Sequence, residues 1–295
     1  MRARGLRAVL AAWASLATAW SHAQTLPASE VWLLDLSRAD RVAPLRISHG
    51  SGYHNQPMFS ADGRSVLFTA EQPGGQTDIW RYEIAGQSLH SVFASPESEF
   101  SPTPIAGEDA LSVVRVEPPD QRQRLWRIRP DGGAAELLLP DVERIGYHAW
   151  LDPNHVVLFI LGDTFDLHLA RIDAGNSRKL VANIGRTLRR HPQNGHALFV
   201  DKSAEPWAIA DFDVATSEVR NVLGLFPGIE DFEVDSSGRY WMGSGSKLYR
   251  SSPENDSWQL FVDLGEWGIG GITRLAVNWD HQLIGFVGNK QGIQN

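Results

Sequence analysis

Side chains able to bind a ligand or transfer protons recur at the beginnings of short apolar segments along this 295-residue chain. They supply imidazole, carboxylate, guanidinium, phenol and amide groups, which can together hold a small ligand or a peptide if the fold brings them to one wet concave surface. The residues predicted to form such a binding site are His54, Glu99, Glu117, Gln123, Tyr147, His148, Arg186, Asp231 and Arg274. Glu117 and Gln123 come from the loops that leave the expected second strands, and the segment starts also carry Ser101, Glu230 and Thr273. A solvated rim of mutually neutralising charges is the alternative interpretation of this set.

A metal site is a second interpretation of some of these residues. Asn55, Glu99 and Asp231 would supply the amide and carboxylate oxygens that a divalent cation accepts, and a bound ion would activate water. His54 and His148 are the histidines placed to assist, which falls short of a His-rich cluster. The sequence therefore predicts no required cofactor, and a divalent cation remains an open alternative.

The sequence lacks the residue patterns of several common types of catalytic and metal site. The chain has no Cys, which excludes disulfides, thiol nucleophiles and Cys-type zinc or iron–sulfur ligation. The strings HGSGYH and MGSGSK lack the spacing of a serine-hydrolase elbow, and neither precedes a helical pattern. His191 and His196 are separated by a Pro and a Gly, which do not fit a metalloprotease helix. No catalytic residue is assigned, and binding is favoured over catalysis.

The elements that must position these residues form a repeat. The clearest copy starts at His54 and contains an apolar segment, an Asp-Gly turn at 62–63, and strands expected over 66–70, 79–84 and 89–94. The copies are anchored at Gly63, Gly107, Asn154, Gly195, Gly238 and His281, which lie 44, 47, 41, 43 and 43 residues apart. A period near 43 with about four short strands per copy is typical of a propeller blade.

The expected third strand of each copy supports this register. Its third position holds Trp80, Trp126, His168, Trp207 and Leu248, and Trp32 occupies the same position in a segment near the start of the chain. We therefore expect residues 30–48 to complete the last blade begun by residues 272–288, which closes the ring and removes an open sheet edge. The prediction is an all-β, six-bladed β-propeller with four-stranded antiparallel blades; a β-sandwich is the alternative. The first strand of each blade lines the tunnel, so the candidate residues should meet at one rim.

The first 23 residues predict a secretory signal peptide. Arg2, Arg4 and Arg7 precede an uncharged run of 13 residues over 8–20, and Ser21-His22-Ala23 offers small residues at the cleavage positions. A run of this length spans about 20 Å as a helix, which is too short for a bilayer core. We expect a mature chain of residues 24–295 forming a single propeller, with no membrane insertion after cleavage.

One segment resembles a known family. The pattern P-x-F-S-x-D-G-R-x-V-L-F followed by D-I-W-R-Y, within residues 55–83, is similar to the repeat box of TolB-type propellers, WD-repeat-like six-bladed proteins of the bacterial periplasm. The second copy keeps Ser101-Pro102 and Trp126, and the remaining copies are degenerate. The resemblance covers residues 30 to about 288. It implies the fold and a periplasmic or secreted location, while the α/β domain that precedes the propeller of TolB is expected to be missing.

These observations predict a non-enzymatic, exported scaffold, monomeric, that binds an envelope protein or peptide at the tunnel mouth. The alternative is a metal-dependent hydrolase or lyase acting on a small sugar or lactone. Glu99, Asn55 and Asp231 match the ligand types of six-bladed lactonase-type hydrolases, and oligogalacturonate lyases carry TolB-like repeats with His-rich metal binding. Removal of three arginines with the signal changes the formal net charge from −8 to −11, so a nucleic-acid partner is not expected.

Overall fold

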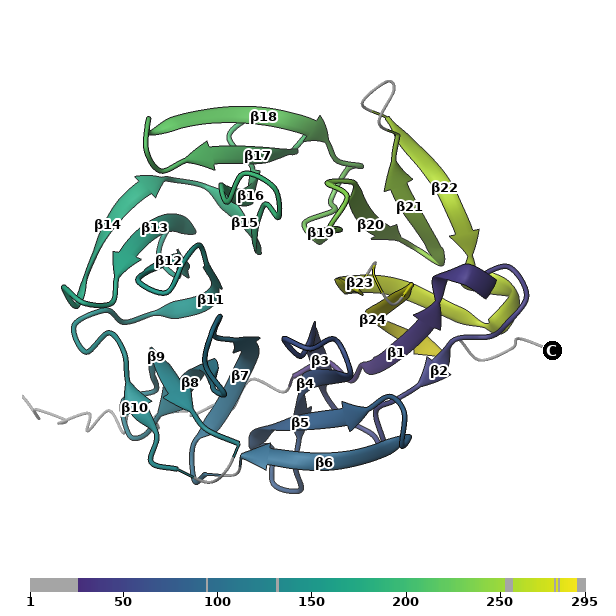
Figure 1. The fold of residues 1–295 in the computed structure, drawn as a ribbon, viewed down its shortest axis with the longest axis horizontal. Helices are drawn as coiled ribbons and strands as arrows, with labels where there is room; N and C mark the ends of the chain where they lie inside the picture. The colour runs from purple at the N-terminus through teal and green to yellow at the C-terminus, as the bar shows by residue number, and fades with distance from the viewer. Residues whose placement is uncertain are drawn as a thin grey trace, which may run out of the picture.

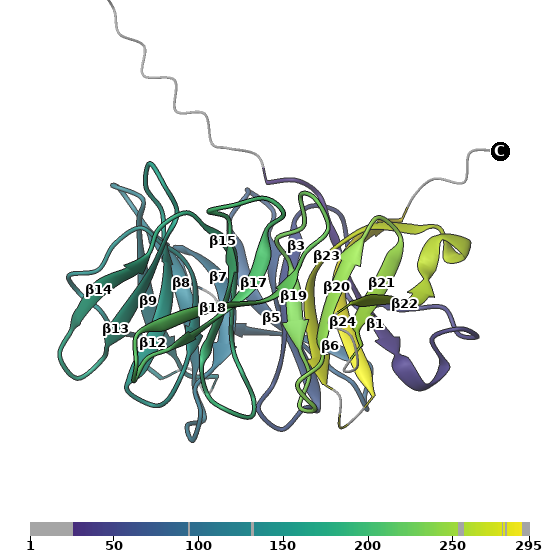
Figure 2. The same ribbon diagram turned by 90° about the horizontal axis from the view of Figure 1, so that it is seen from above.

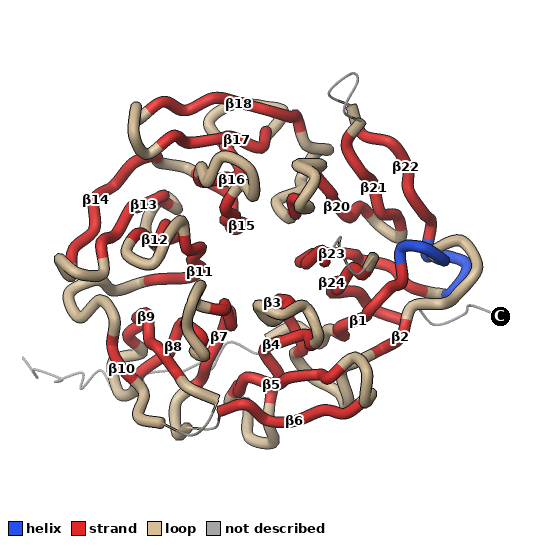
Figure 3. Tube along the Cα trace, viewed as in Figure 1, coloured by secondary structure: helices blue, strands red, loops and turns tan. Residues whose placement is uncertain are grey.

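The computed structural model describes residues 26–290 except 94, 131–132, 253–256, 279 and 281. These residues form 24 strands and two short 3-10 helices, and the strands make six four-stranded antiparallel sheets. The sheets stand as blades around a central axis (Figure 1), and almost all regular structure is strand (Figure 3). The predicted six-bladed propeller is therefore confirmed. The predicted signal peptide lies outside the described residues.

Each of the first five blades is built from four consecutive strands, with the first strand of the blade next to the tunnel. The first blade contains β3 (His54–Phe59), β4 (Ser65–Glu71), β5 (Thr77–Glu83) and β6 (Ser88–Phe93). The second contains β7 (Ser98–Pro104), β8 (Leu111–Glu117), β9 (Arg122–Ile128) and β10 (Glu136–Leu137). The third contains β11 (Ile145–Trp150), β12 (His155–Ile160), β13 (Asp166–Arg171) and β14 (Asn176–Val181). The fourth contains β15 (Ile184–Arg190), β16 (Ala197–Asp201), β17 (Ala208–Asp213) and β18 (Glu218–Gly224). The fifth contains β19 (Phe232–Val234), β20 (Tyr240–Ser244), β21 (Lys247–Ser251) and β22 (Trp258–Asp263).

The last blade joins both ends of the described chain. Its strands are β23 (Ile269–Asn278), β24 (Leu283–Lys290), β1 (Glu30–Asp35) and β2 (Leu45–Arg46), in that order from the tunnel outward. β1 pairs with β24 along its whole length, in a register that sets Trp32 opposite Phe286. The helices η1 (Leu36–Arg38) and η2 (Leu264–Trp267) lie beside this blade. The expected closure of the ring by N-terminal strands is confirmed.

Apolar side chains from neighbouring blades pack face to face and form the core. Trp32, Trp241 and Phe286 belong to one cluster between the fifth and last blades, while Val31 and Phe68 belong to the next cluster around the ring. Period-two alternation in each strand sends successive side chains to opposite faces, so each blade contributes to two such clusters. The blades stand side by side between two loop-bearing faces, as the view from above shows (Figure 2). Within the described residues no helix is long and apolar enough to cross a membrane.

Candidate functional site

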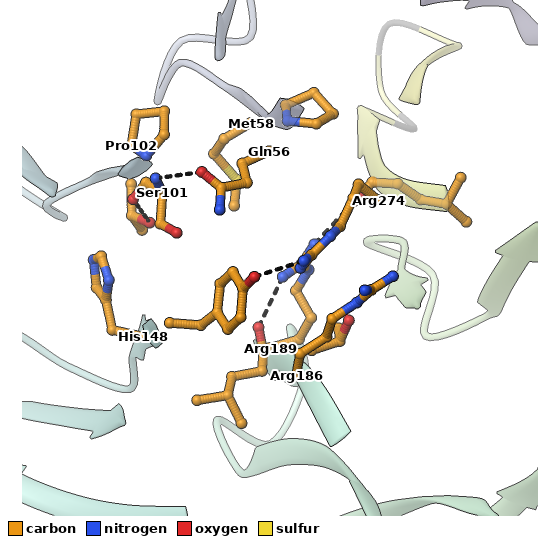
Figure 4. Close-up of a pocket in the computed structure, with 14 residues that line it drawn as sticks. Gln56, Met58, Ser101, Pro102, His148, Arg186, Arg189 and Arg274 are labelled. Atoms are coloured by element: carbon orange, nitrogen blue, oxygen red, sulfur yellow. Dashed lines mark hydrogen bonds between the residues drawn. The ribbon is translucent and has the colours of Figure 1, made fainter. Parts of the chain in front are cut away.

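A polar cavity lies at the centre of the ring, between the first strands of five blades. The space among its lining residues is about 480 Å³ when the adjoining open solvent is included, and the centres of water molecules can occupy about 50 Å³ of it. Its wall comes from β3, β7, β11, β15 and β23 and contains Gln56, Pro57, Met58, Ser101, Pro102, Thr103, Tyr147, His148, Arg186, Thr187, Leu188, Arg189, Arg274 and Leu275. Three arginines occupy one side of the cavity, and His148 and Ser101 occupy the opposite side (Figure 4). Residues more than 170 positions apart in the chain thus form one site.

Irregularities in the first strands direct these side chains. The pairing register between first and second strand shifts within each of the five lining strands. Gln56, Ser101 and Arg274 sit at such points with φ of 58°, 56° and 51°. An extra residue in one strand turns its side chain away from the ordinary alternation, and a left-handed backbone is rare for residues with a side chain. Backbone geometry of this kind often accompanies a functional surface.

One buried carboxylate serves two guanidinium groups on the cationic side. Arg186 donates two hydrogen bonds to Asp231, from Nε to Oδ1 at 3.1 Å and from Nη2 to Oδ2. Arg274 approaches the same carboxylate, with Nε 3.6 Å from Oδ1. Burial raises the pKa of Asp231, but Arg274 and Arg186 outweigh burial and hold that pKa below its usual value. Asp231 is therefore ionised, and the Arg186–Asp231–Arg274 group carries one net positive charge.

Tyr147 positions Arg274 in the cavity. The Arg274 guanidinium donates from Nη2 to the Tyr147 hydroxyl at 2.6 Å and lies 4.6 Å from the centre of the Tyr147 ring. Tyr53 lies close by, and burial is the main cause that raises its pKa. The Tyr53 hydroxyl is therefore a neutral hydrogen-bonding group near neutral pH.

The other charged groups near this end are paired off. All three nitrogens of Arg189 are used: Nε donates to Glu233 at 2.7 Å, and the two terminal nitrogens donate to the backbone oxygens of Leu188 and Leu275. Lys202 donates to Glu230 at 2.8 Å. Each of these two pairs is internally balanced, so neither cancels the net charge of the Asp231 group. The Arg189–Glu233 pair joins the first strands β15 and β19, and Glu230 also accepts from the backbone N–H of Arg186 on β15 at 3.1 Å.

His148 forms the neutral side of the cavity together with a buried serine. His148 Nε2 lies 2.6 Å from Ser112 Oγ, which also accepts a hydrogen bond from Trp150 Nε1 at 2.8 Å. Burial lowers the pKa of His148 to about 3, so its ring is neutral at physiological pH. Its Nδ1 atom is buried and has no partner among the described residues.

A second unpaired polar atom lies on the same side. Ser101 Oγ is buried without a partner in the described part of the chain, although its residue lines the cavity. Its backbone N–H donates to Gln56 Oε1 at 2.8 Å, and Thr69 donates to the same oxygen at 2.8 Å. The Gln56 side chain is thus oriented with its oxygen toward protein. Unpaired buried polar groups are uncommon and costly, and a ligand or water commonly satisfies them.

The structure brings some of the predicted site residues together. Tyr147, His148, Arg186 and Arg274 line the cavity, and Asp231 lies directly behind the two arginines. His54 does not line it: the side chain is 4% exposed, contacts the Ser29 backbone oxygen through Nδ1, and borders a separate hollow.

Three other predicted residues lie away from the cavity. Glu99 has no exposed surface and pairs with Arg115 between the first two blades. Glu117 accepts from Arg124 and Trp126 on the second blade, and Gln123 borders a shallow hollow beside the third blade. The expected rim is therefore divided between a central site and several peripheral ones.

The predicted oxygen ligands for a metal are not assembled. Asn55 bonds to Ser29, Glu99 to Arg115 and Ser95, and Asp231 to Arg186. No group of three His, Cys, Asp or Glu side chains among the described residues is close enough to hold a metal ion. Since the cavity wall carries arginines, its donor set does not fit a divalent cation.

Several lining residues were not selected from the sequence, and two of them carry long polar side chains. Gln56 and Arg189 stand in the cavity wall but were not among the predicted site residues. The sequence does contain a signal for Gln56. The dipeptides Gln56-Pro57 and Ser101-Pro102 occupy corresponding places in the first and second blades, since in each blade the backbone N–H that closes the following turn lies four residues after the first residue of the dipeptide. Arg189 belongs to the densest basic cluster in the sequence, which could have marked it.

Comparisons with known proteins identify the architecture. No family model matches the chain. A putative TolB from Agrobacterium tumefaciens superposes with a TM-score of 0.67 at 15% identity, covering 88% of this chain and 97% of that one. TolB from Acinetobacter baumannii superposes with a TM-score of 0.60 at 10% identity, and the match covers 90% of this chain and 64% of that one. The chain has the TolB-like propeller fold. Identities this low establish the fold and not the activity.

Two further similarities extend this comparison. An oligogalacturonate lyase in complex with manganese superposes on the TolB-like propeller with a TM-score of 0.56 at 12% identity, covering 84% of this chain and 80% of that one. An uncharacterised protein of Agrobacterium fabrum is 28% identical over 115 residues. That match spans 37% of this chain and 38% of the relative's length. The fold is thus shared by proteins of different function.

Proposed function

We propose that this TolB-like propeller is an exported binding protein that engages a protein or peptide of the cell envelope at the mouth of its tunnel. The observation that carries the proposal is the central cavity, whose buried wall holds two polar atoms, Ser101 Oγ and His148 Nδ1, without partners among the described residues. A ligand that supplies hydrogen-bonding groups there would remove the cost of leaving them unpaired.

The walls of the cavity are held in place before binding, which favours recognition of a ligand. These walls are first strands anchored by hydrogen-bonded ladders on one side and by the Arg189–Glu233 and Lys202–Glu230 pairs on another. Groups held in place before binding lose little conformational entropy when a ligand enters. Rigid blades with variable surface loops also allow new partners without changes to the core.

The Ser112–His148 pair does not support a hydrolase. Ser112 is completely buried and its oxygen already accepts from Trp150, so a substrate carbonyl cannot reach it. No carboxylate in the described chain contacts His148 Nδ1, although a nucleophile-activating histidine needs a group that orients it. The pair therefore favours a role in shaping the cavity wall.

Export is part of the proposal. The basic start, the uncharged run and the small residues before Gln24 favour cleavage after Ala23. N-terminal sequencing of protein recovered outside the cytoplasm checks this, and a product retaining Met1 in the membrane contradicts it.

The tunnel role can be tested by capture from envelope extracts. Arg186→Ala and His148→Ala should weaken retention of a specific partner at least tenfold, because buried arginine and aromatic anchors commonly contribute 2 kcal/mol or more and each decade is about 1.4 kcal/mol. Arg220→Ala, an exposed change on β18, is the matched control. A photo-crosslinking residue at Met58, in the wall, should label the partner, and one at the exposed Leu260 should not.

The melting temperature of each variant separates lost binding from lost folding. Retention that survives both tunnel changes, in proteins that remain folded, contradicts the proposed site. So does a crosslink that forms at Leu260 and not at Met58.

A further inference from the structure

The cationic end of the cavity carries a charge that the described protein does not balance. Arg186 and Arg274 share the single carboxylate of Asp231, whereas Arg189 and Lys202 each have a carboxylate of their own. No acidic side chain is part of the cavity wall itself. A cationic group in a partly enclosed polar pocket is stabilised by an anion, because the interaction is screened less there than at an open surface.

Donor atoms for such an anion are present on both arginines. Arg186 uses Nε and Nη2 for Asp231, and Arg274 uses Nη2 for Tyr147, while Nη1 of each has no partner among the described residues. A guanidinium group binds carboxylates and phosphates through N–H groups that form a planar fork. Tyr147 and Asp231 fix the two arginines beforehand, so little order has to be gained on binding.

The size of the spare charge favours a carboxylate over a phosphate group. Two guanidinium groups and one carboxylate leave one positive charge, which one carboxylate neutralises. A phosphate monoester carries about −1.5 to −2 near neutral pH and would leave the cavity anionic. Neutral hydrogen-bonding groups, His148 Nδ1 and Ser101 Oγ, occupy the opposite side and suit uncharged polar groups next to the acid (Figure 4).

We propose that the Arg186–Arg274 end of the cavity binds one carboxylate group of a peptide segment that enters the tunnel, with its neighbouring polar groups against Ser101 and His148. The inference rests on the proposed function, since it specifies what the partner inserts. The carboxylate comes from an Asp or Glu side chain or from a chain terminus, and the two sources share the same chemistry.

His148 gives the proposal a second, independent consequence. Its neutral ring carries one hydrogen, on Nδ1 or on Nε2. Ser112 Oγ donates its single hydrogen to the Thr103 backbone oxygen at 3.2 Å, so in the free protein it accepts the hydrogen that His148 carries on Nε2. A polar ligand oxygen at Nδ1 favours the hydrogen on Nδ1, with Ser112 donating to Nε2. Binding should therefore shift the two ring nitrogens of His148 in opposite directions in a 15N spectrum.

Three labelled hexapeptides of one sequence provide the binding test, measured by fluorescence anisotropy with the mature protein. One has a central Glu and an amidated end, one has Gln there and a free C-terminus, and one has Gln and an amidated end. At least one acidic peptide should bind tenfold or more tighter than the neutral one, and the preferred peptide identifies the source of the carboxylate.

Arg274→Gln tests the site. It removes the spare charge and leaves the Arg186–Asp231 pair balanced, so it should abolish the preference for the acidic peptide. Arg220→Gln, on the exposed outer strand β18, should keep the preference. Should Arg274→Gln fail to fold, the His148 nitrogen shifts in the unmodified protein provide the test.

Equal binding of acidic and neutral peptides overturns the inference, as does a preference that survives Arg274→Gln. Absence of binding by either acidic peptide at millimolar concentration, or unchanged His148 nitrogens in a saturated complex, also overturns it. In each case the envelope partner can still be retained through the tunnel, so this failure is distinguishable from failure of the proposed function, which is marked by retention insensitive to tunnel changes.

Discussion

Two buried carboxyl groups show how local partners determine ionisation in this protein. Asp231 is surrounded by Arg274 and Arg186, which outweigh the effect of burial and keep its pKa low. Glu99 is also buried, but burial dominates there and raises its pKa to about 7 despite hydrogen bonds from Ser95 and Arg115. Its second oxygen has no partner in the described chain. The first residue therefore supports a charged binding site, and the second makes stability depend on pH.

Glu99→Gln should reduce the pH dependence of stability. The folded state holds a proton on Glu99 between the ordinary pKa of 4.5 and about 7, whereas the unfolded chain releases it. Stability from this group is therefore present below pH 4.5 and is lost as pH rises through 7. Between pH 5 and 7.5 the loss is roughly 2 kcal/mol, taking about 1.4 kcal/mol per pKa unit.

Urea unfolding at pH 5 and pH 7.5 measures this difference. The fall in the free energy of unfolding should be smaller by about that amount in Glu99→Gln than in the unmodified chain. Burial also raises the pKa of Asp78, which contributes a fall of the same sign in both proteins. Glu218→Gln, at an exposed position on β18, is the control. The same fall in both variants would contradict the role assigned to Glu99.

At the scale of the strands, the sequence determines the blades better than it determines the direction of each side chain. The repeat and its Trp positions predicted six blades and their closure, and the segment starts led to Tyr147, His148, Arg186 and Arg274 in the cavity. Glu99 lies two residues before Ser101, at which the backbone is left-handed. A shift of one residue moves side chains to the other face of a strand. Because the repeat pattern does not reveal such bulges, the sequence does not determine which residues face the tunnel.

Close approach of neighbouring blades also depends on single residues that the repeat does not reveal. A Cβ atom at Gly243 on β20 would lie 2.5 Å from Ile272 Cγ2 and 2.8 Å from the Ile272 backbone oxygen on β23. Backbone cannot move aside as a flexible side chain can, so this glycine sets the distance between the fifth and last blades. Ile272 lies on the same strand, β23, that carries Arg274 into the cavity.

Gly243→Ala should destabilise the fold by about 1–3 kcal/mol, the usual cost of inserting a methyl group into a well-packed core. Gly224→Ala is the matched control, because nothing lies within 4 Å of its Cβ position. Chemical unfolding of both variants at one pH checks this. If Gly243→Ala were as stable as Gly224→Ala, the fifth and last blades would have to be less tightly packed than the structure indicates.

At the scale of the whole molecule, the ring depends on a contact between residues about 250 positions apart. β1 pairs with β24 along its whole length, from Glu30 opposite Gly288 to Asp35 opposite Leu283. Trp32 Nε1 adds a bond to the Gly288 backbone oxygen at 3.3 Å. Without β1, the last blade would present an unpaired strand edge and both adjacent core clusters would open to water. The tunnel cavity needs this closure, since β23 of the same blade contributes Arg274.

Deletion of residues 30–36 should therefore unfold the protein or cost several kcal/mol. The deleted strand buries Val31, Trp32, Leu33 and Leu34, each 7% exposed or less, and fully burying one such side chain contributes about 1.5–3 kcal/mol. The total is comparable to the 5–15 kcal/mol that holds a typical domain folded. Deletion of residues 24–28 is the control, because Pro27 and Ala28 are exposed and Ser29, which bonds to Gly52 and His54, is retained. Thermal and urea unfolding of the two truncated proteins provide the comparison. A protein lacking 30–36 that unfolds at the same denaturant concentration as one lacking 24–28 would mean that the ring closes without the N-terminal strand, and the last blade would then need another partner for β24.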